Sequence, residues 1–189
     1  MRTQEKLHKI RGDVSDFVNS LIKDAGGFAA VEFAMIVPVM IIMLLGSVEV
    51  SDALTVDRHL NTIADSLSDL VARSPAVTAA DLKDIMRIAD SLLGKYPRQN
   101  LAMEVVSLEP NAGGVMQVAW SYDSKGGQPY APGSTYPGSW NGMVSGANSL
   151  IVAKAKYLYR SPVGQFIHGN ISLSHVASYE SRQGKVVGP

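Results

Sequence analysis

The sequence predicts an α+β fold in which one long N-terminal helix spans a membrane and packs on a small head, made of an antiparallel sheet and one further helix. Three observations predict it. An uncharged apolar run covers residues 33–48, an apolar stripe at helical spacing follows it to residue 70, and β-rich runs separated by Gly- and Pro-rich turns fill residues 102–181.

The composition excludes some classes of function. The 189 residues carry a formal net charge of +0, so nothing indicates a nucleic-acid partner. The chain contains no cysteine, which excludes disulfides and thiolate metal sites and leaves the compartment open.

The membrane segment is predicted at residues 28–48, which read FAAVEFAMIVPVMIIMLLGSV. A helix of this length rises roughly 31 Å, which matches the hydrocarbon core of a bilayer. A soluble-core helix would keep a polar face, and a cleaved secretory signal would have a shorter apolar core, so a retained anchor is favoured over both. Pro38 removes one backbone donor inside the run and is expected to kink the helix.

The flanking charges predict the orientation. Bases precede the helix at Arg2, Lys6, Lys9, Arg11 and Lys23, whereas acids follow it before the first base. The positive-inside rule therefore puts residues 1–27 in the cytoplasm as a leader and residues 49–189 outside. The leader has apolar residues at helical spacing, which fits either a helix on the inner membrane surface or a partly disordered amphipathic segment.

Glu32 does not fit a plain anchor. A carboxylate at the centre of a bilayer costs about 2.5–3.5 kcal/mol, and less near the interface. One interpretation is that Glu32 only snorkels to the headgroups, since Phe28 is one helical turn away. The other uses its neighbours: Gly27, Phe28 and Glu32 form a G-F-x3-E pattern at the start of the apolar run. This pattern resembles the processing site of type IV prepilins, which implies cleavage after Gly27 and a new amine on Phe28.

The wider N-terminal segment is similar to the signature of the TadE-like family, the minor pseudopilins TadE and TadF of the tight-adherence (Tad, Flp) pilus machinery. It reads V-E-F-A from Val31, then an aliphatic run with Pro38, then G-x-x-E from Gly46 to Glu49. The C-terminal part resembles the family more loosely, with an aromatic-x-x-Pro turn at Tyr159 and a last strand ending near an arginine. The resemblance implies a pilin-like plan, in which the helix is half in lipid and half on the head.

The head is expected to begin with the continuation of the same helix. Its apolar stripe consists of Ala53, Val56, Leu60, Ile63, Leu67 and Leu70. This stripe either covers the protein's own sheet or forms a seam for a partner subunit. A second helix is predicted at 79–93, with Thr78 and Asp81 in capping-box positions.

Strands are predicted at 102–108, 115–122, 150–160 and about 171–181, with Met116, Val118, Trp120 and Tyr122 on one face of the second strand. The long loop 123–147 carries Tyr130, Tyr136 and Trp140. These aromatic side chains are either exposed candidates for partner contact or fold back to cover the sheet edge.

No catalytic pattern was found, so we expect no enzyme, no cofactor and no metal site. The four histidines, His8, His59, His168 and His175, lack metal-ligand spacing. The chain has no P-loop and no G-x-S-x-G or G-x-G-x-x-G motif.

Two functions follow from these observations. The first is a minor pseudopilin or assembly component of a Tad pilus, cut by a prepilin peptidase and supporting pilus biogenesis, adherence and biofilm formation. Its partners would be the bacterial inner membrane, other Tad pilins and pseudopilins, and assembly-platform proteins, with the head in the periplasm or associated with the pilus. The alternative is a membrane-tethered periplasmic binding module that keeps its leader.

Overall fold

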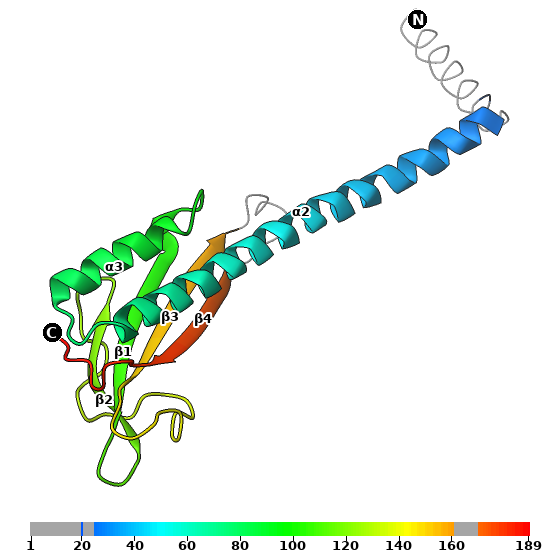
Figure 1. Cartoon of the computed structure of the whole chain (residues 1–189). Coiled ribbons are helices and arrows are strands. Elements are labelled where there is room, and N and C mark those ends of the chain that lie inside the picture. Colours follow the sequence, from blue (N-terminus) through cyan, green and yellow to red (C-terminus); the bar gives the residue numbers. More distant parts are fainter. Residues whose placement is uncertain (1–19, 21–24, 161–169) are drawn as a thin grey trace, which may run out of the picture. The chain divides into compact units, whose positions relative to one another are not determined.

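The computed structural model of the chain describes residue 20, residues 25–160 and residues 170–189. Its elements are α2 (Ala25–Ala72), α3 (Ala79–Ser91), the 3-10 helix η1 (Arg98–Asn100), β1 (Leu101–Pro110), β2 (Met116–Asp123), β3 (Leu150–Arg160) and β4 (Asn170–Glu180) (Figure 1). A long apolar helix, one further helix and a four-stranded antiparallel sheet confirm the predicted α+β fold. The apolar pattern of the predicted leader lies outside the described residues, as do His8 and His168.

Two compact units divide the chain, with the border between Val48 and Glu49. The first unit contains the N-terminal part of α2, and the second contains the rest of α2 with all the other described elements. Helix α2 runs unbroken through Pro38. It ends at Ala72, shortly before Ser74-Pro75, because the residue before a proline is pushed out of the helical region.

The sheet of the second unit has the strand order β2-β1-β3-β4, and every neighbouring pair is antiparallel. The C-terminal part of α2 packs with α3 on one face of the sheet (Figure 1). The core between the helices and the sheet contains side chains from α2, α3 and the strands. Among them are Leu60 and Leu67 of α2, Leu82 of α3 and Tyr157 of β3, all 0–2% exposed. Each such burial stabilises the fold by about 1.5–3 kcal/mol.

The apolar stripe of α2 covers the protein's own sheet between Val56 and Leu67. Its predicted last member was wrong, because Leu70 is 40% exposed and Val71 is buried instead. A strict spacing of three and four residues assumes 3.5 residues per turn, whereas a straight α-helix has 3.6, so the buried face drifts by about 20° per heptad.

Helix α3 begins with the predicted capping box. The Thr78 side chain accepts a hydrogen bond from the Asp81 amide (3.2 Å), and the Asp81 carboxylate accepts one from the Thr78 amide (2.9 Å). The helix is amphipathic and buries Leu82, Met86 and Ala89. Gly94 follows its last turn with a φ of 67°, a conformation that glycine adopts without strain.

Strand β2 does not keep one face throughout, which corrects the predicted alternation. The register of β1 and β2 shifts at Ser107/Leu108, so that Ser107 faces Trp120 and Leu108 faces Val118. Ala119 is therefore an extra residue, a β-bulge that turns the strand over. Trp120 joins the core under the helices, whereas Val118 joins a second cluster on the opposite face.

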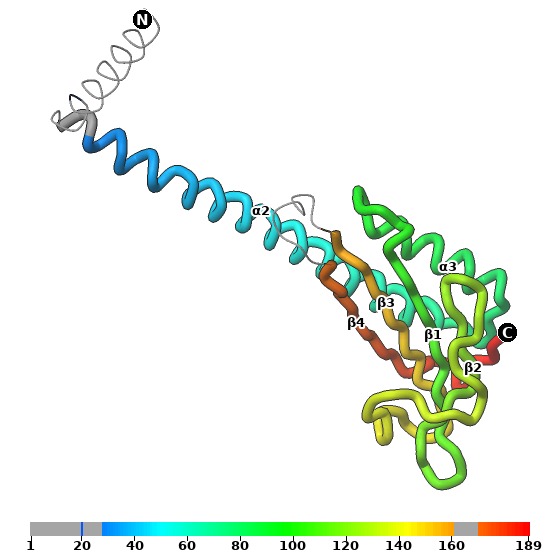
Figure 2. Tube along the Cα trace, turned by 180° about the vertical axis from the view of Figure 1, so that it is seen from behind, coloured from blue at the N-terminus to red at the C-terminus, as the bar shows by residue number. Residues whose placement is uncertain are grey.

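The long loop after β2 covers that opposite face and the free edge of β2 (Figure 2). Backbone hydrogen bonds join Val118 of β2 to Gly133 (2.7 Å) and Ser134 (2.9 Å) of the loop. Unpaired edge strands invite association with other chains, so this loop protects one side of the sheet.

Candidate functional site

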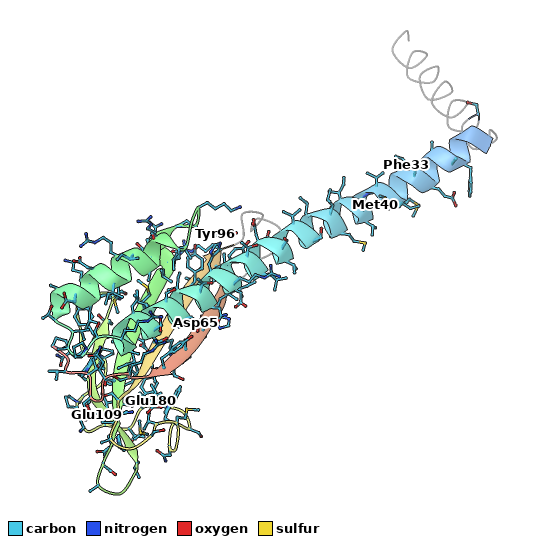
Figure 3. The ribbon with its side chains drawn as sticks, viewed as in Figure 1. Phe33, Met40, Asp65, Tyr96, Glu109 and Glu180 are labelled. Carbon is cyan, nitrogen blue, oxygen red and sulfur yellow. The ribbon has the colours of Figure 1, made fainter. Side chains whose placement is uncertain are left out.

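The first part of α2 has the surface of a membrane anchor. Its apolar side chains are exposed on all sides, among them Met35 (73%) and Met43 (70%). Phe33 and Met40 project from the ribbon with nothing packed against them (Figure 3). Within the part of the chain that the structure describes, this is the one helix long and apolar enough to cross a membrane. Exposed apolar surface of this extent is unfavourable in water and favourable in lipid, so the helix indicates a membrane anchor.

Glu32 lies on this apolar surface, one turn after Phe28. Its side chain is exposed, and no described residue forms a hydrogen bond or ion pair with it. The Phe28 side chain is 65% exposed. The peptide bond between Gly27 and Phe28 is part of helix α2, which begins at Ala25. Gly26 and Gly27 lower the helix propensity beside this bond, because glycine loses more backbone entropy in a helix than other residues.

A row of acidic residues follows, where α2 enters the second unit. The first is Glu49, which is only 9% exposed although it carries a carboxylate. The Tyr159 hydroxyl of β3 donates a hydrogen bond to Glu49 Oε1 at 3.5 Å. A buried carboxylate needs such a donor, because leaving the charge unpaired in a desolvated position costs several kcal/mol.

The next two acids of the row also contact the head. Asp52 Oδ1 accepts a hydrogen bond from the Tyr96 hydroxyl (3.1 Å) and lies 3.4 Å from Lys95 Nζ. Asp57 Oδ2 lies 3.3 Å from His175 Nε2 of β4. Tyr96 lies beside α2 (Figure 3). The three acids thus join α2 to β3, to the segment after α3 and to β4, and we call these contacts the acidic row.

Electrostatics at the acidic row change the ionisation of its tyrosines. Burial, with smaller contributions from the charges of Glu49 and Asp52, raises the pKa of Tyr159 to about 12. Burial also raises the pKa of Tyr96, with a smaller contribution from Asp52. Both phenols therefore stay protonated and able to donate at physiological pH.

The aromatic residues of the long loop form a packed cluster. Tyr136 is 5% exposed, with Tyr130 and Trp140 partly buried at ring distances of 4.9 and 5.8 Å from it. The Tyr136 hydroxyl donates a hydrogen bond to Glu104 at 3.2 Å, and burial raises the pKa of Tyr136 well above its usual range. The sequence left two roles open for these aromatic residues, partner contact or packing back on the sheet. The Tyr136 ring packs against the sheet.

In the sequence, the acids after the anchor indicated only the orientation in the membrane. Their partners in the head were not predicted. Two parts of the predicted family resemblance, the Glu49 of G-x-x-E and the Tyr159 of aromatic-x-x-Pro, are 110 positions apart and meet here. Because both residues belong to the family resemblance, a contact between them could have been proposed from the sequence. Among the described residues no three His, Cys, Asp or Glu side chains gather as a metal site.

Comparison with known protein families gives a match that lies in α2. Residues 27–66 match a family model described as TadE-like protein. The match covers the anchor, Glu32, the acidic row and the first buried turns of the head helix. No curated protein and no solved structure shows significant similarity to the chain. Residues 27–66 are therefore a TadE-like segment, as the N-terminal signature predicted.

Proposed function

We propose that this chain is a membrane-anchored assembly component of a Tad (Flp) pilus, a minor pseudopilin that supports pilus biogenesis and, through it, adherence and biofilm formation. The observation that carries the proposal is the position of the TadE-like match. It begins at Gly27 and lies wholly within α2. It includes both Glu32, which has no partner among the described residues, and the helix turns that pack in the head core. No catalytic role is part of the proposal.

Processing is the first step of the proposed mechanism. A prepilin peptidase on the cytoplasmic side cuts after Gly27, which removes the leader and frees an ammonium group on Phe28. Gly26 and Gly27 precede the scissile bond, and their low helix propensity favours the local unwinding that a peptidase needs. The head then faces the periplasm, and the chain stays in the inner membrane through one helix.

Assembly is the second step, and it depends on Glu32. A carboxylate among exposed apolar side chains is costly in lipid until it meets a positive charge. The new amine on Phe28 of a neighbouring pilin is such a charge, at the same depth of the membrane. Pairing between subunits therefore removes two unpaired charges from lipid and favours the packing of anchors from this chain and other Tad pilins or pseudopilins on the assembly platform.

The acidic row gives the anchor a defined connection to the head. Glu49, Asp52 and Asp57 each contact a different part of the head, so α2 is held at several points just after the membrane segment. We infer that these contacts keep this stretch of α2 packed on the rest of the head, which is the surface that other pilus components meet.

The proposal is tested by deletion and complementation in the organism that encodes the chain, with pili quantified in the sheared surface fraction. Glu32→Gln should insert in the membrane normally and fail to restore pili. Asp84→Asn is the matched control, since Asp84 is an exposed acid of the head that pairs only with Arg87. If the deletion leaves pilus number unchanged, the assembly function is wrong. If Glu32→Gln restores pili fully, charge pairing in the membrane is wrong.

The alternative, a tethered periplasmic binding module that keeps its leader, relied on exposed aromatic residues in the long loop. Tyr136, the central one, is buried, and its hydroxyl is used by Glu104. Tyr130 and Trp140 remain partly exposed, and we favour the assembly role because of the TadE-like match over residues 27–66.

A further inference from the structure

A pocket of about 590 Å³ opens on the head between α3, η1, β1 and the turn after β2. Its floor is apolar and includes Met86, Leu101 and Met103. Its walls carry four basic residues, Lys83, Arg87, Arg98 and Lys125, and one acidic residue, Asp90. A volume of this size suits a small ligand, and the pocket is separate from the anchor and from the acidic row.

The cations of this pocket are incompletely neutralised. Among the described residues, neither Lys83 nor Lys125 forms an ion pair. Arg98 lies 3.6 Å from Asp90 Oδ2, and Arg87 pairs with Asp84 outside the pocket lining. The chain as a whole has a formal net charge of +0, so this excess of positive charge is local. Converging cations in a concave site attract anions.

The pocket also contains acceptor and donor groups that the protein does not use fully. Asp90 Oδ1 is buried, and no described residue donates a hydrogen bond to it. Asp90 lines the pocket, and the terminal torsion of a carboxylate is soft, so its oxygens can adjust to a ligand. The Ser124 hydroxyl accepts a hydrogen bond from the Met103 amide, which leaves its own proton available. Leaving a buried acceptor without a donor is unfavourable, so a ligand donor here would stabilise the complex.

We propose that this pocket binds an acidic saccharide, meaning a sugar unit that carries a carboxylate together with free hydroxyls. The carboxylate lies between Lys83 and Lys125, where two ammonium groups are unpaired. A sugar hydroxyl donates to Asp90, and the Ser124 hydroxyl donates to a second sugar oxygen. The apolar floor, with Tyr122 beside it, takes the C–H face of the ring. A simple inorganic anion would use the cations and be repelled by Asp90.

The test uses the full chain in lipid nanodiscs and measures binding of trigalacturonate by calorimetry at low salt. Neutral maltotriose and citrate are the comparison ligands. We expect saturable binding of trigalacturonate, at least tenfold tighter than that of maltotriose and weaker at higher ionic strength. The double variant Lys83→Gln/Lys125→Gln should lose at least tenfold in affinity. Lys185→Gln should change it less than twofold, because that exposed lysine pairs with Glu109 away from the pocket.

Asp90→Ala separates a saccharide site from a plain anion site. It should weaken trigalacturonate several-fold, because a hydroxyl loses its acceptor, and strengthen citrate, because a negative charge is removed. The proposal is overturned if Asp90→Ala strengthens both ligands, if maltotriose binds as well as trigalacturonate, or if the lysine variant binds like the unmodified chain. The two lysines are exposed, so their variant is informative even if Asp90→Ala does not fold.

Discussion

Tyr159→Phe removes one hydroxyl from the acidic row and leaves the ring in place. The Tyr159 side chain is 3% exposed, and its hydroxyl donates to Glu49 Oε1 at 3.5 Å. At neutral pH the change deletes a long hydrogen bond to a buried carboxylate. We expect the free energy of unfolding of the head to fall by about 1 kcal/mol.

At alkaline pH the same hydroxyl destabilises the folded unmodified chain, so there the substitution shifts stability in the opposite direction. The pKa of Tyr159 is about 12 in the folded chain, against an ordinary value of 10. As pH rises above 10, the unfolded chain loses this proton while the folded chain keeps it, so stability falls. Below pH 10 the contribution of the phenol is fully present. The expected loss is about 1.4 kcal/mol at pH 11, and it approaches roughly 3 kcal/mol once pH exceeds 12.

The assay is urea unfolding of the full chain in detergent at pH 8 and pH 11, followed by the fluorescence of Trp120, which is buried in the head core. Tyr159→Phe should be less stable than the unmodified chain at pH 8 and should lose about 1.4 kcal/mol less between the two pH values. The two proteins differ only at position 159, so the difference between them isolates Tyr159.

Glu49→Gln is the matched control for that experiment. Burial is the main cause of the raised pKa of Tyr159, and Glu49 is a secondary one. This variant should therefore keep most of the alkaline loss. If Tyr159→Phe and the unmodified chain lose equal stability between pH 8 and pH 11, the buried contact between α2 and β3 is wrong.

Three further changes test other parts of the structure. Leu67→Ala removes a fully buried side chain between α2 and the sheet and should lower the free energy of unfolding by about 2–5 kcal/mol. Leu70 is exposed, so Leu70→Ala should change this free energy by less than about 0.5 kcal/mol. Equal losses in the two variants would refute the packed face of α2. Thr78→Ala removes the cap of α3 and should cost about 1 kcal/mol in the same assay, with an unchanged stability contradicting the capping box. A Cβ at Gly46 meets no described atom within 4 Å, so Gly46→Leu should preserve head stability. Pilus number should fall, because a leucine there keeps neighbouring anchors apart; normal pilus number would contradict close packing of anchors at this position.

Local signals predicted most of the fold. The apolar run and the stripe that follows predicted one continuous helix because each residue of a helix contacts neighbours three and four positions away. The capping box predicted the start of α3, because Thr78 and Asp81 are only three positions apart and their contact is local. The strand from Leu150 to Arg160 has its predicted bounds, and no bulge interrupts its pairing with β1.

Features that depend on distant residues were not predictable from the sequence. The bulge at Ala119 arises from the pairing of β2 with β1, and it moved Met116 and Val118 to the opposite face. The burial of Tyr136 depends on Glu104, which lies 32 positions earlier. The acidic row was visible as charges, but its partners are far along the chain, so the sequence alone predicted an orientation and no contacts.

The N-terminus of the mature protein tests the proposed pseudopilin role most directly. The chain should be expressed with and without a prepilin peptidase, and its first residues determined by sequencing. We predict a chain that begins at Phe28 when the peptidase is present and one that keeps its leader when it is absent. Gly26→Ala should still be cut, whereas Gly27→Val should not. A chain that keeps its leader in both conditions would contradict the processing step on which the proposed pairing of Glu32 depends.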